Sequence, residues 1–172
     1  PPLVREALTP LVRQLECLDE EITRADDRMR ATAKSNEVAR RLMSIPGIGP
    51  VTASAIAATV HDPSAFASGR AFAASLGLTP RQNSSGGKAR LGRISKMGNR
   101  YLRKLLVVGA HAVLFHRKGH TDALRSWACK LMETKPFKLV AVALANKLAR
   151  IAFAVIRDNK RYSTIESGPA SA

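Results

Sequence analysis

Acidic residues are scarce in most of this sequence. Beyond residue 40 the chain has five carboxylate side chains, which are scattered: Asp62, Asp122, Glu133, Asp158 and Glu166. A site that transfers phosphoryl groups with its own Mg²⁺ needs several carboxylates close together to hold the metal. The sequence therefore argues against a self-sufficient, metal-dependent nuclease.

Cysteine and aromatic residues are also few. The two cysteines, Cys17 and Cys129, do not form a C-x-x-C pair. This excludes a zinc knuckle and fits a protein of a reducing cytosol. Aromatic residues make up 5% of the chain, whereas Ala, Leu and Val abound, and this composition favours helices.

Targeting signals and uninterrupted apolar segments are missing as well. The longest apolar helix candidate, around residues 139–156, is interrupted by Asn146, Lys147 and Arg150. A helix needs about 20 consecutive, predominantly apolar residues to cross a bilayer. No secretory signal pattern is visible, and we expect no membrane partner.

Positive charge, in contrast, is abundant and concentrated. Residues 1–40 have 7 Lys/Arg and 8 Asp/Glu, whereas residues 41–172 have 21 Lys/Arg and 5 Asp/Glu, a net charge of +16. A cationic excess confined to one region indicates a polyanionic partner, of which nucleic acid is the usual one. The alternative is a basic surface that only keeps the protein in solution.

The first 40 residues carry a heptad pattern. Apolar residues recur at spacings of three and four at Leu8, Leu11, Leu15, Leu18, Ile22, Ala25 and Met29. We expect a helix that begins at Thr9–Pro10 and forms a homodimer, or a higher homo-oligomer, through a coiled coil of Leu11, Leu15, Leu18 and Ile22. The alternative is a long helix folded back on its own domain.

Residues 41–60, RLMSIPGIGPVTASAIAATV, resemble a helix–hairpin–helix motif. The glycines of the turn would let a phosphate approach Gly47, Ile48 and Gly49, and free N–H groups at the second helix would hold the anion. Such contacts position nucleic acid without reading bases. The alternative is a helix pair that uses the turn only for packing.

The rest of the chain is expected to be helical. Helices are predicted over residues 69–77, 100–117 with Asn99 as cap, 122–133 with Asp122 at its start, and 136–157. No segment demands a strand. We therefore predict an all-α protein with a dimerisation helix over 1–40, a helical domain over 41–162 and a frayed tail over 163–172.

The stretch NSSGGKARLGRISKMGNRYLRKLL, residues 83–106, combines a serine pair with many cations and no carboxylate. The candidate nucleic-acid-binding cations are Arg81, Lys88, Arg90, Arg93, Lys96, Arg100, Arg103 and Lys104, the last three on one helix face. From spacing alone, Ser84 and Ser85 could hold a phosphate in a turn or attack one. No proton acceptor is visible nearby.

Three histidines could suggest a metal site. His111, His116 and His120 lie near a predicted helix end, without a neighbouring Cys or acid. We interpret them as favourable charge at a helix C-terminus and predict no metal ligands in this chain.

The sequence also resembles a known family. IPGIGPVTA and GLTPRQNSSGGKARLGRISKMGNRYLRKLLV are similar to the C-terminal transposase domain of the insertion-sequence one-ten family, over residues 38–157. These are serine-dependent, bridge-RNA-guided recombinases related to the Piv DNA invertase. The heptad segment matches the family's coiled coil.

The resemblance implies a function. Family members cut and rejoin DNA through a covalent phosphoserine, which maps to Ser84, with Ser85 as the fallback. It implies DNA and a noncoding guide RNA as partners, and a bacterial or archaeal cytoplasmic, nucleoid-associated protein. It also implies Mg²⁺ in an N-terminal RuvC-like domain that this chain lacks, so we expect a fragment that is inactive alone.

Two other functions remain open. One is a non-catalytic DNA- or RNA-binding module with a dimerising helix. The other is a nuclease subunit that borrows its acidic residues from a partner and cleaves DNA with water.

Overall fold

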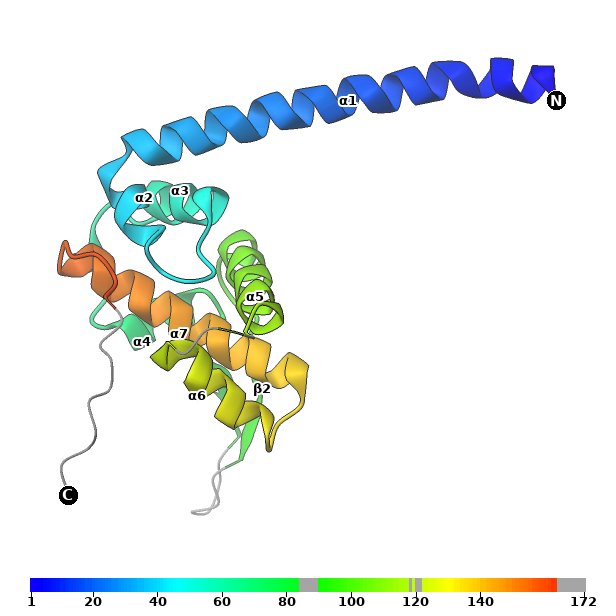
Figure 1. The fold of residues 1–172 in the computed structure, drawn as a ribbon. Coiled ribbons are helices and arrows are strands. Elements are labelled where there is room, and N and C mark those ends of the chain that lie inside the picture. Colours follow the sequence, from blue (N-terminus) through cyan, green and yellow to red (C-terminus); the bar gives the residue numbers. More distant parts are fainter. Residues whose placement is uncertain (84–89, 118, 120–121, 164–172) are drawn as a thin grey trace.

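The computed structural model of the chain describes residues 1–83, 90–117, 119 and 122–163 (Figure 1). The helices are α1 (Pro2–Ser35), α2 (Glu37–Leu42), α3 (Pro50–Thr59), α4 (Gly69–Ser75), α5 (Arg100–Phe115), α6 (Ala123–Met132) and α7 (Phe137–Arg157), with a 3₁₀ turn at Pro63–Ala65. Strands β1 (Pro80–Gln82) and β2 (Leu91–Ile94) form an antiparallel pair. The all-α prediction is confirmed, although the short hairpin was not predicted.

Helix α1 extends from the rest of the fold, and its free end is the N-terminus (Figure 1). The predicted start at Thr9–Pro10 is wrong, because the helix begins at Pro2 and runs through Pro10. Pro2 suits a first helical turn, since its missing N–H would have no partner there. The Thr9 hydroxyl donates to the Arg5 carbonyl at 2.7 Å, within the helix, instead of capping it.

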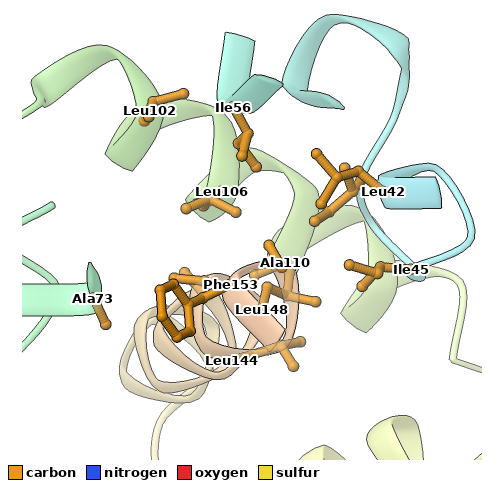
Figure 2. Close-up of a cluster of buried hydrophobic side chains, with 14 of the residues drawn as sticks. Leu42, Ile45, Ile56, Ala73, Leu102, Leu106, Ala110, Leu144, Leu148 and Phe153 are labelled. Carbon is orange, nitrogen blue, oxygen red and sulfur yellow. The ribbon is translucent and has the colours of Figure 1, made fainter. Parts of the chain in front are cut away.

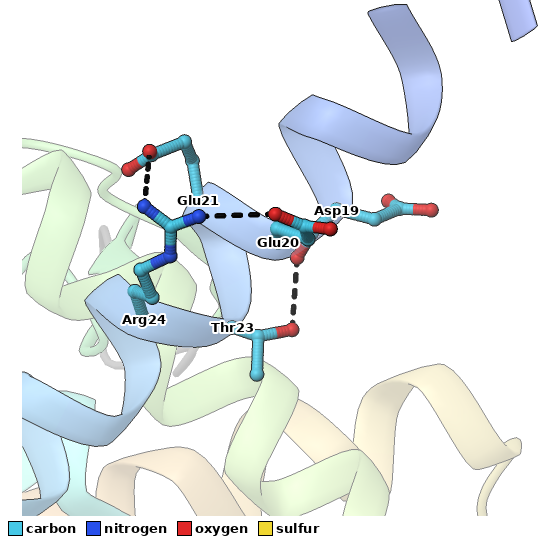
Figure 3. A network of polar contacts seen from close by, with 5 residues as sticks. All are labelled: Asp19, Glu20, Glu21, Thr23 and Arg24. Carbon is cyan, nitrogen blue, oxygen red and sulfur yellow. Dashed lines mark hydrogen bonds and ion pairs between the residues drawn. The ribbon is translucent and has the colours of Figure 1, made fainter. Parts of the chain in front are cut away.

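The surface of α1 is almost entirely exposed. Ala33 is its one buried residue among those whose burial is described, and the helix packs on α2 and α3. The Arg24 guanidinium pairs with Glu20 at 3.0 Å and Glu21 at 2.8 Å (Figure 3). Exposed ion pairs of this kind contribute about 0.2–1 kcal/mol each.

Helix α7 forms the centre of the core. Ten of its residues are buried, and α5 and α4 pack against it. Its Leu144, Leu148 and Phe153 belong to one buried cluster with side chains of α2, α4 and α5, which pack on α7, and with Ile56 of α3, which packs on α5 (Figure 2). By length and composition α7 could cross a membrane, the one such helix in the described part of the chain, but over half of it is buried inside the fold.

The predicted helix caps are confirmed. Asn99 accepts a hydrogen bond from the Leu102 N–H at 3.0 Å, and Asp122 accepts one from the Arg125 N–H at 3.0 Å. These bonds satisfy N–H groups that the first turn of a helix leaves without partners. Local sequence therefore sets where α5 and α6 begin, and α5 begins directly beside the hairpin.

Candidate nucleic-acid interface

The β1–β2 hairpin presents the segment that the sequence singled out. Its described ladder runs from Gly77, which accepts from the Lys96 N–H, to Asn83, whose N–H donates to Arg90 O at 2.8 Å. The chain enters residues 84–89 from Asn83 and leaves them at Arg90. The predicted nucleophile Ser84, its fallback Ser85 and the cation Lys88 all lie outside the described residues.

The base of the hairpin is clamped to the end of α4 by two glycines. Gly77 has φ +68° and Gly98 has φ +85°, a region that L side chains rarely adopt. A Cβ on Gly77 would overlap the Met97 carbonyl oxygen, and a Cβ on Gly98 would overlap that of Ser75. Only glycine lets the two backbones lie this close.

Arg103 strengthens the same clamp. Its guanidinium donates to Leu76 O at 2.8 Å and to Met97 O at 3.4 Å, so it joins both ends of the hairpin base. The side chain was predicted to contact nucleic acid and is half-buried. Its neighbours Arg100 and Lys104 on α5 are exposed, as a phosphate contact requires.

The described residues of the hairpin include four exposed cations, Arg81, Arg90, Arg93 and Lys96. Arg81, Arg93 and Lys96 line a recess of about 320 Å³, and Arg81 also donates to Ser95 O at 3.2 Å. No Asp or Glu lies between Asp62 and Asp122 in the sequence. An anion at this recess would meet positive charge without a carboxylate competing for it.

The two glycines of the α2–α3 turn have different surroundings: Gly47 packs closely against α5, and Gly49 is exposed. Gly47 has φ +84°, and a Cβ there would lie 2.7 Å from Val113 Cγ2 and 2.8 Å from Gly109 O. Ile48 is buried. Gly49 is exposed and is the N-cap of α3, and a Cβ added to it would meet no atom within 4 Å. The close approach at Gly47 is thus made by α5, and the predicted phosphate contact stays a prediction.

A larger groove lies beside the hairpin, and sequence reasoning missed it. It has a volume of about 1500 Å³ and runs between β2, the start of α4, Trp127 of α6 and one face of α7. Its cationic lining residues are Arg70, Arg93, Lys96, Lys138, Lys147 and Arg150, with Arg157 in an ion pair with Asp158. The spacing of Lys147, Arg150 and Arg157 by three and seven residues places them on one helix face and could have revealed it.

Lys147 is the most constrained of these cations. Its Nζ lies 4.2 Å from the centre of the Trp127 ring, a cation–π contact. Burial lowers the pKa of Lys147, and the positive charge of Arg150 lowers this pKa further. An anion in the groove would relieve this repulsion.

Three of the five carboxylates beyond residue 40 have partners elsewhere. The Asp62 carboxylate accepts hydrogen bonds from Ser64, Asp122 pairs with Arg125, and Asp158 pairs with Arg157. The His111 ring packs against Phe137, with their centres 5.2 Å apart. Within the described part of the chain no three His, Cys, Asp or Glu side chains gather.

Comparison with known proteins identifies the family. Residues 39–125, half of the chain, match the model of the transposase IS116/IS110/IS902 family. The chain is 45% identical over 157 residues, 91% of its length, to "Probable family 20 transposase" of Pseudomonas aeruginosa, of which it covers 46%. It is 41% identical to the transposase for insertion sequence element IS1111A of Coxiella burnetii, over 94% of the chain and 44% of that protein.

A more distant relative has a different name. The chain is 31% identical over 136 residues, 78% of its length, to the pilin gene-inverting protein of Moraxella bovis, of which it covers 41%. The chain thus spans less than half the length of these relatives. Because the family model matches half of its residues, the chain belongs to the IS116/IS110/IS902 family of transposases.

Proposed function

We propose that this chain is the DNA-joining part of a transposase and that Ser84 is its nucleophile, with Ser85 as the alternative. The observation that carries the proposal is the hairpin, whose exposed Arg81, Arg90 and Arg93 flank the serine segment in a region without carboxylates. Family membership and the names of the relatives support DNA as the substrate.

The reaction would be a transesterification. The Ser84 Oγ–P bond forms as the P–O bond to the adjoining nucleotide breaks, and the released nucleotide oxygen takes up a proton. The serine proton passes to a base that the described residues do not supply. Cations of the hairpin would stabilise the charge on the phosphate oxygens as it grows.

Other parts of the proposal concern partners. Lys88, Arg100 and Lys104 would add phosphate contacts, and the backbone at Gly49 would hold a phosphate at the start of α3. A noncoding RNA would guide the choice of DNA, and two copies would pair through α1. The Mg²⁺ chemistry would belong to an acid-bearing domain outside this chain, and the fragment alone would be inactive.

The test is covalent trapping in the full-length protein with its guide RNA. A DNA substrate that cannot be rejoined should leave a protein–DNA adduct, and peptide mapping should place it on Ser84. Ser84→Ala should abolish both adduct and recombination, whereas Ser85→Ala should retain them. Normal recombination by both single variants would overturn the assignment.

The same experiment separates the two rivals. A module that only binds nucleic acid would form no adduct and would leave the DNA intact. A nuclease subunit that uses water would cleave the DNA without an adduct. Either result would remove the serine mechanism while leaving the family membership unchanged.

A further inference from the structure

The groove along α7 has the charge of a polyanion site. Six cationic side chains line it without an ion pair among the described residues, and no Asp or Glu of the described part of the chain lies in its lining. These cations come from α4, the hairpin and α7, which are far apart in the sequence. Folding has therefore gathered positive charge around one hollow, at a cost in repulsion that a bound anion would offset.

Part of the groove lining is apolar. Leu139 is 52% exposed, and Val142, Ile151 and Trp127 also face the hollow. A DNA duplex keeps its bases stacked inside and would touch the groove mainly through phosphates. An unpaired strand can place base faces on the apolar side chains of the lining and phosphates on the cationic ones.

The groove adjoins the recess at the hairpin. Gly92, Arg93, Ile94 and Lys96 line both hollows. A strand with a phosphate in the recess would therefore meet cations of the groove next along its path. This shared lining favours the DNA strand that is cut over a separate nucleic acid.

We propose that the α7 groove binds an unpaired segment of the substrate DNA strand, with phosphates on Arg93, Lys138 and Arg150 and bases against Leu139, beside the Trp127 ring that holds Lys147. The choice of DNA rests on the proposed function, but binding in the groove does not require Ser84 to be the nucleophile. The groove would hold an opened strand next to the point of cleavage.

Trp127 provides a local probe, because it is the one tryptophan of the 172-residue chain. A single-stranded DNA of about 12 nucleotides should change its emission saturably, and the matching duplex should bind several-fold more weakly. RNA of the same sequence should bind no more tightly than the DNA. Binding detected by anisotropy without a change in Trp127 emission would show that the DNA does not bind in the groove. Clearly tighter binding of RNA would contradict DNA as the ligand.

Charge variants test the cationic side chains of the lining. Lys138→Gln with Arg150→Gln removes two exposed groove cations and should make the negative slope of log K against log salt shallower by about 1.4, or 0.7 per phosphate contact. Lys160→Gln with Arg161→Gln removes the same charge from exposed residues beyond α7 and should leave the slope nearly unchanged. Equal slopes for the two double variants would contradict the proposal.

One more pair of variants separates this inference from the serine mechanism. Leu139→Glu places a carboxylate in the groove lining at an exposed position, so the fold should survive while DNA binding weakens at least several-fold. Ser84→Ala should bind DNA like the parent chain, as measured by Trp127 emission. If Ser84→Ala loses covalent trapping but still binds DNA, the defect lies in the nucleophile. If Leu139→Glu loses binding, the defect lies in the groove.

Discussion

At the scale of single residues, the hairpin depends on contacts that leave no space for a side chain. Gly77 and Gly98 place the base of the hairpin against the end of α4, and Arg103 spans the same junction with two backbone carbonyls. Any shift of this base would move the cations on β2. The clamp therefore connects packing with the position of the proposed reacting segment.

Gly98→Ala tests the clamp. The added methyl group would overlap the Ser75 carbonyl oxygen at a positive φ, so we expect a loss of about 1–3 kcal/mol in the free energy of unfolding. Urea denaturation measures it. Gly49→Ala is the control, because its Cβ would meet nothing within 4 Å and its φ is −86°; a loss of about 1 kcal/mol or less is expected there. Equal losses would contradict the clamp.

At the scale of elements, the sequence predicted those parts whose signals are local. Helices α5 and α6 were expected from their periodicity and from Asn99 and Asp122, and the caps do lie there. The hairpin was missed because its strands have three and four residues and carry no alternation. Its stability comes from α4 and from Arg103 on α5, which no window of adjacent residues contains.

The cap of α6 makes a pH-dependent prediction. Burial raises the pKa of Asp122, but hydrogen bonds from Arg125 outweigh this and hold that pKa below its usual value. A carboxyl with a lower pKa in the folded state stabilises above the unfolded value of about 3.9, and the effect is lost as the pH falls through the folded pKa. Asp122→Asn keeps the cap but removes the charge.

We therefore expect Asp122→Asn to unfold at lower urea than the parent at pH 7, with the difference shrinking below about pH 4. Urea unfolding at several pH values measures this. Glu133→Gln, an equal charge change at the exposed end of α6, is the matched control. A difference that stays constant with pH would show that the charge of Asp122 contributes no stability.

At the scale of the whole molecule, charge predicted the kind of partner but not where it binds. The excess over residues 41–172 indicated nucleic acid, and the hairpin cations were found from the sequence. The groove was not found from the sequence, because Arg70, Trp127 and Lys147 are far apart in the chain and line one hollow only after folding. The predicted nucleophile lies outside the described residues, so the sequence remains its main support.

The exposed stripe on α1 predicts an assembly of two chains. Leu11, Leu15, Leu18 and Ile22 are 51–63% exposed, which is a large apolar surface to leave in water. Leu15→Glu with Ile22→Glu should convert a dimer to a monomer, because the new charges would face each other across the coiled coil. Light scattering measures the mass.

Thr9→Glu with Thr23→Glu is the control for this prediction. It adds the same charge on the side of α1 away from the seam and should leave the dimer intact. An unchanged mass for Leu15→Glu with Ile22→Glu, or a monomeric parent, would remove the coiled coil.

A single residue, Asn36, separates α1 from α2, and its side chain caps α2 at the Ala39 N–H. With 34 residues at about 1.5 Å each, α1 is about 50 Å long. If paired chains meet along it, α1 sets how far each groove-bearing body lies from the paired segment and how that body is turned about the helix axis. Adding seven residues between the paired segment and Asn36 would move each body about 10 Å along the axis and nearly keep its rotation, whereas adding two would turn each body by roughly half a revolution.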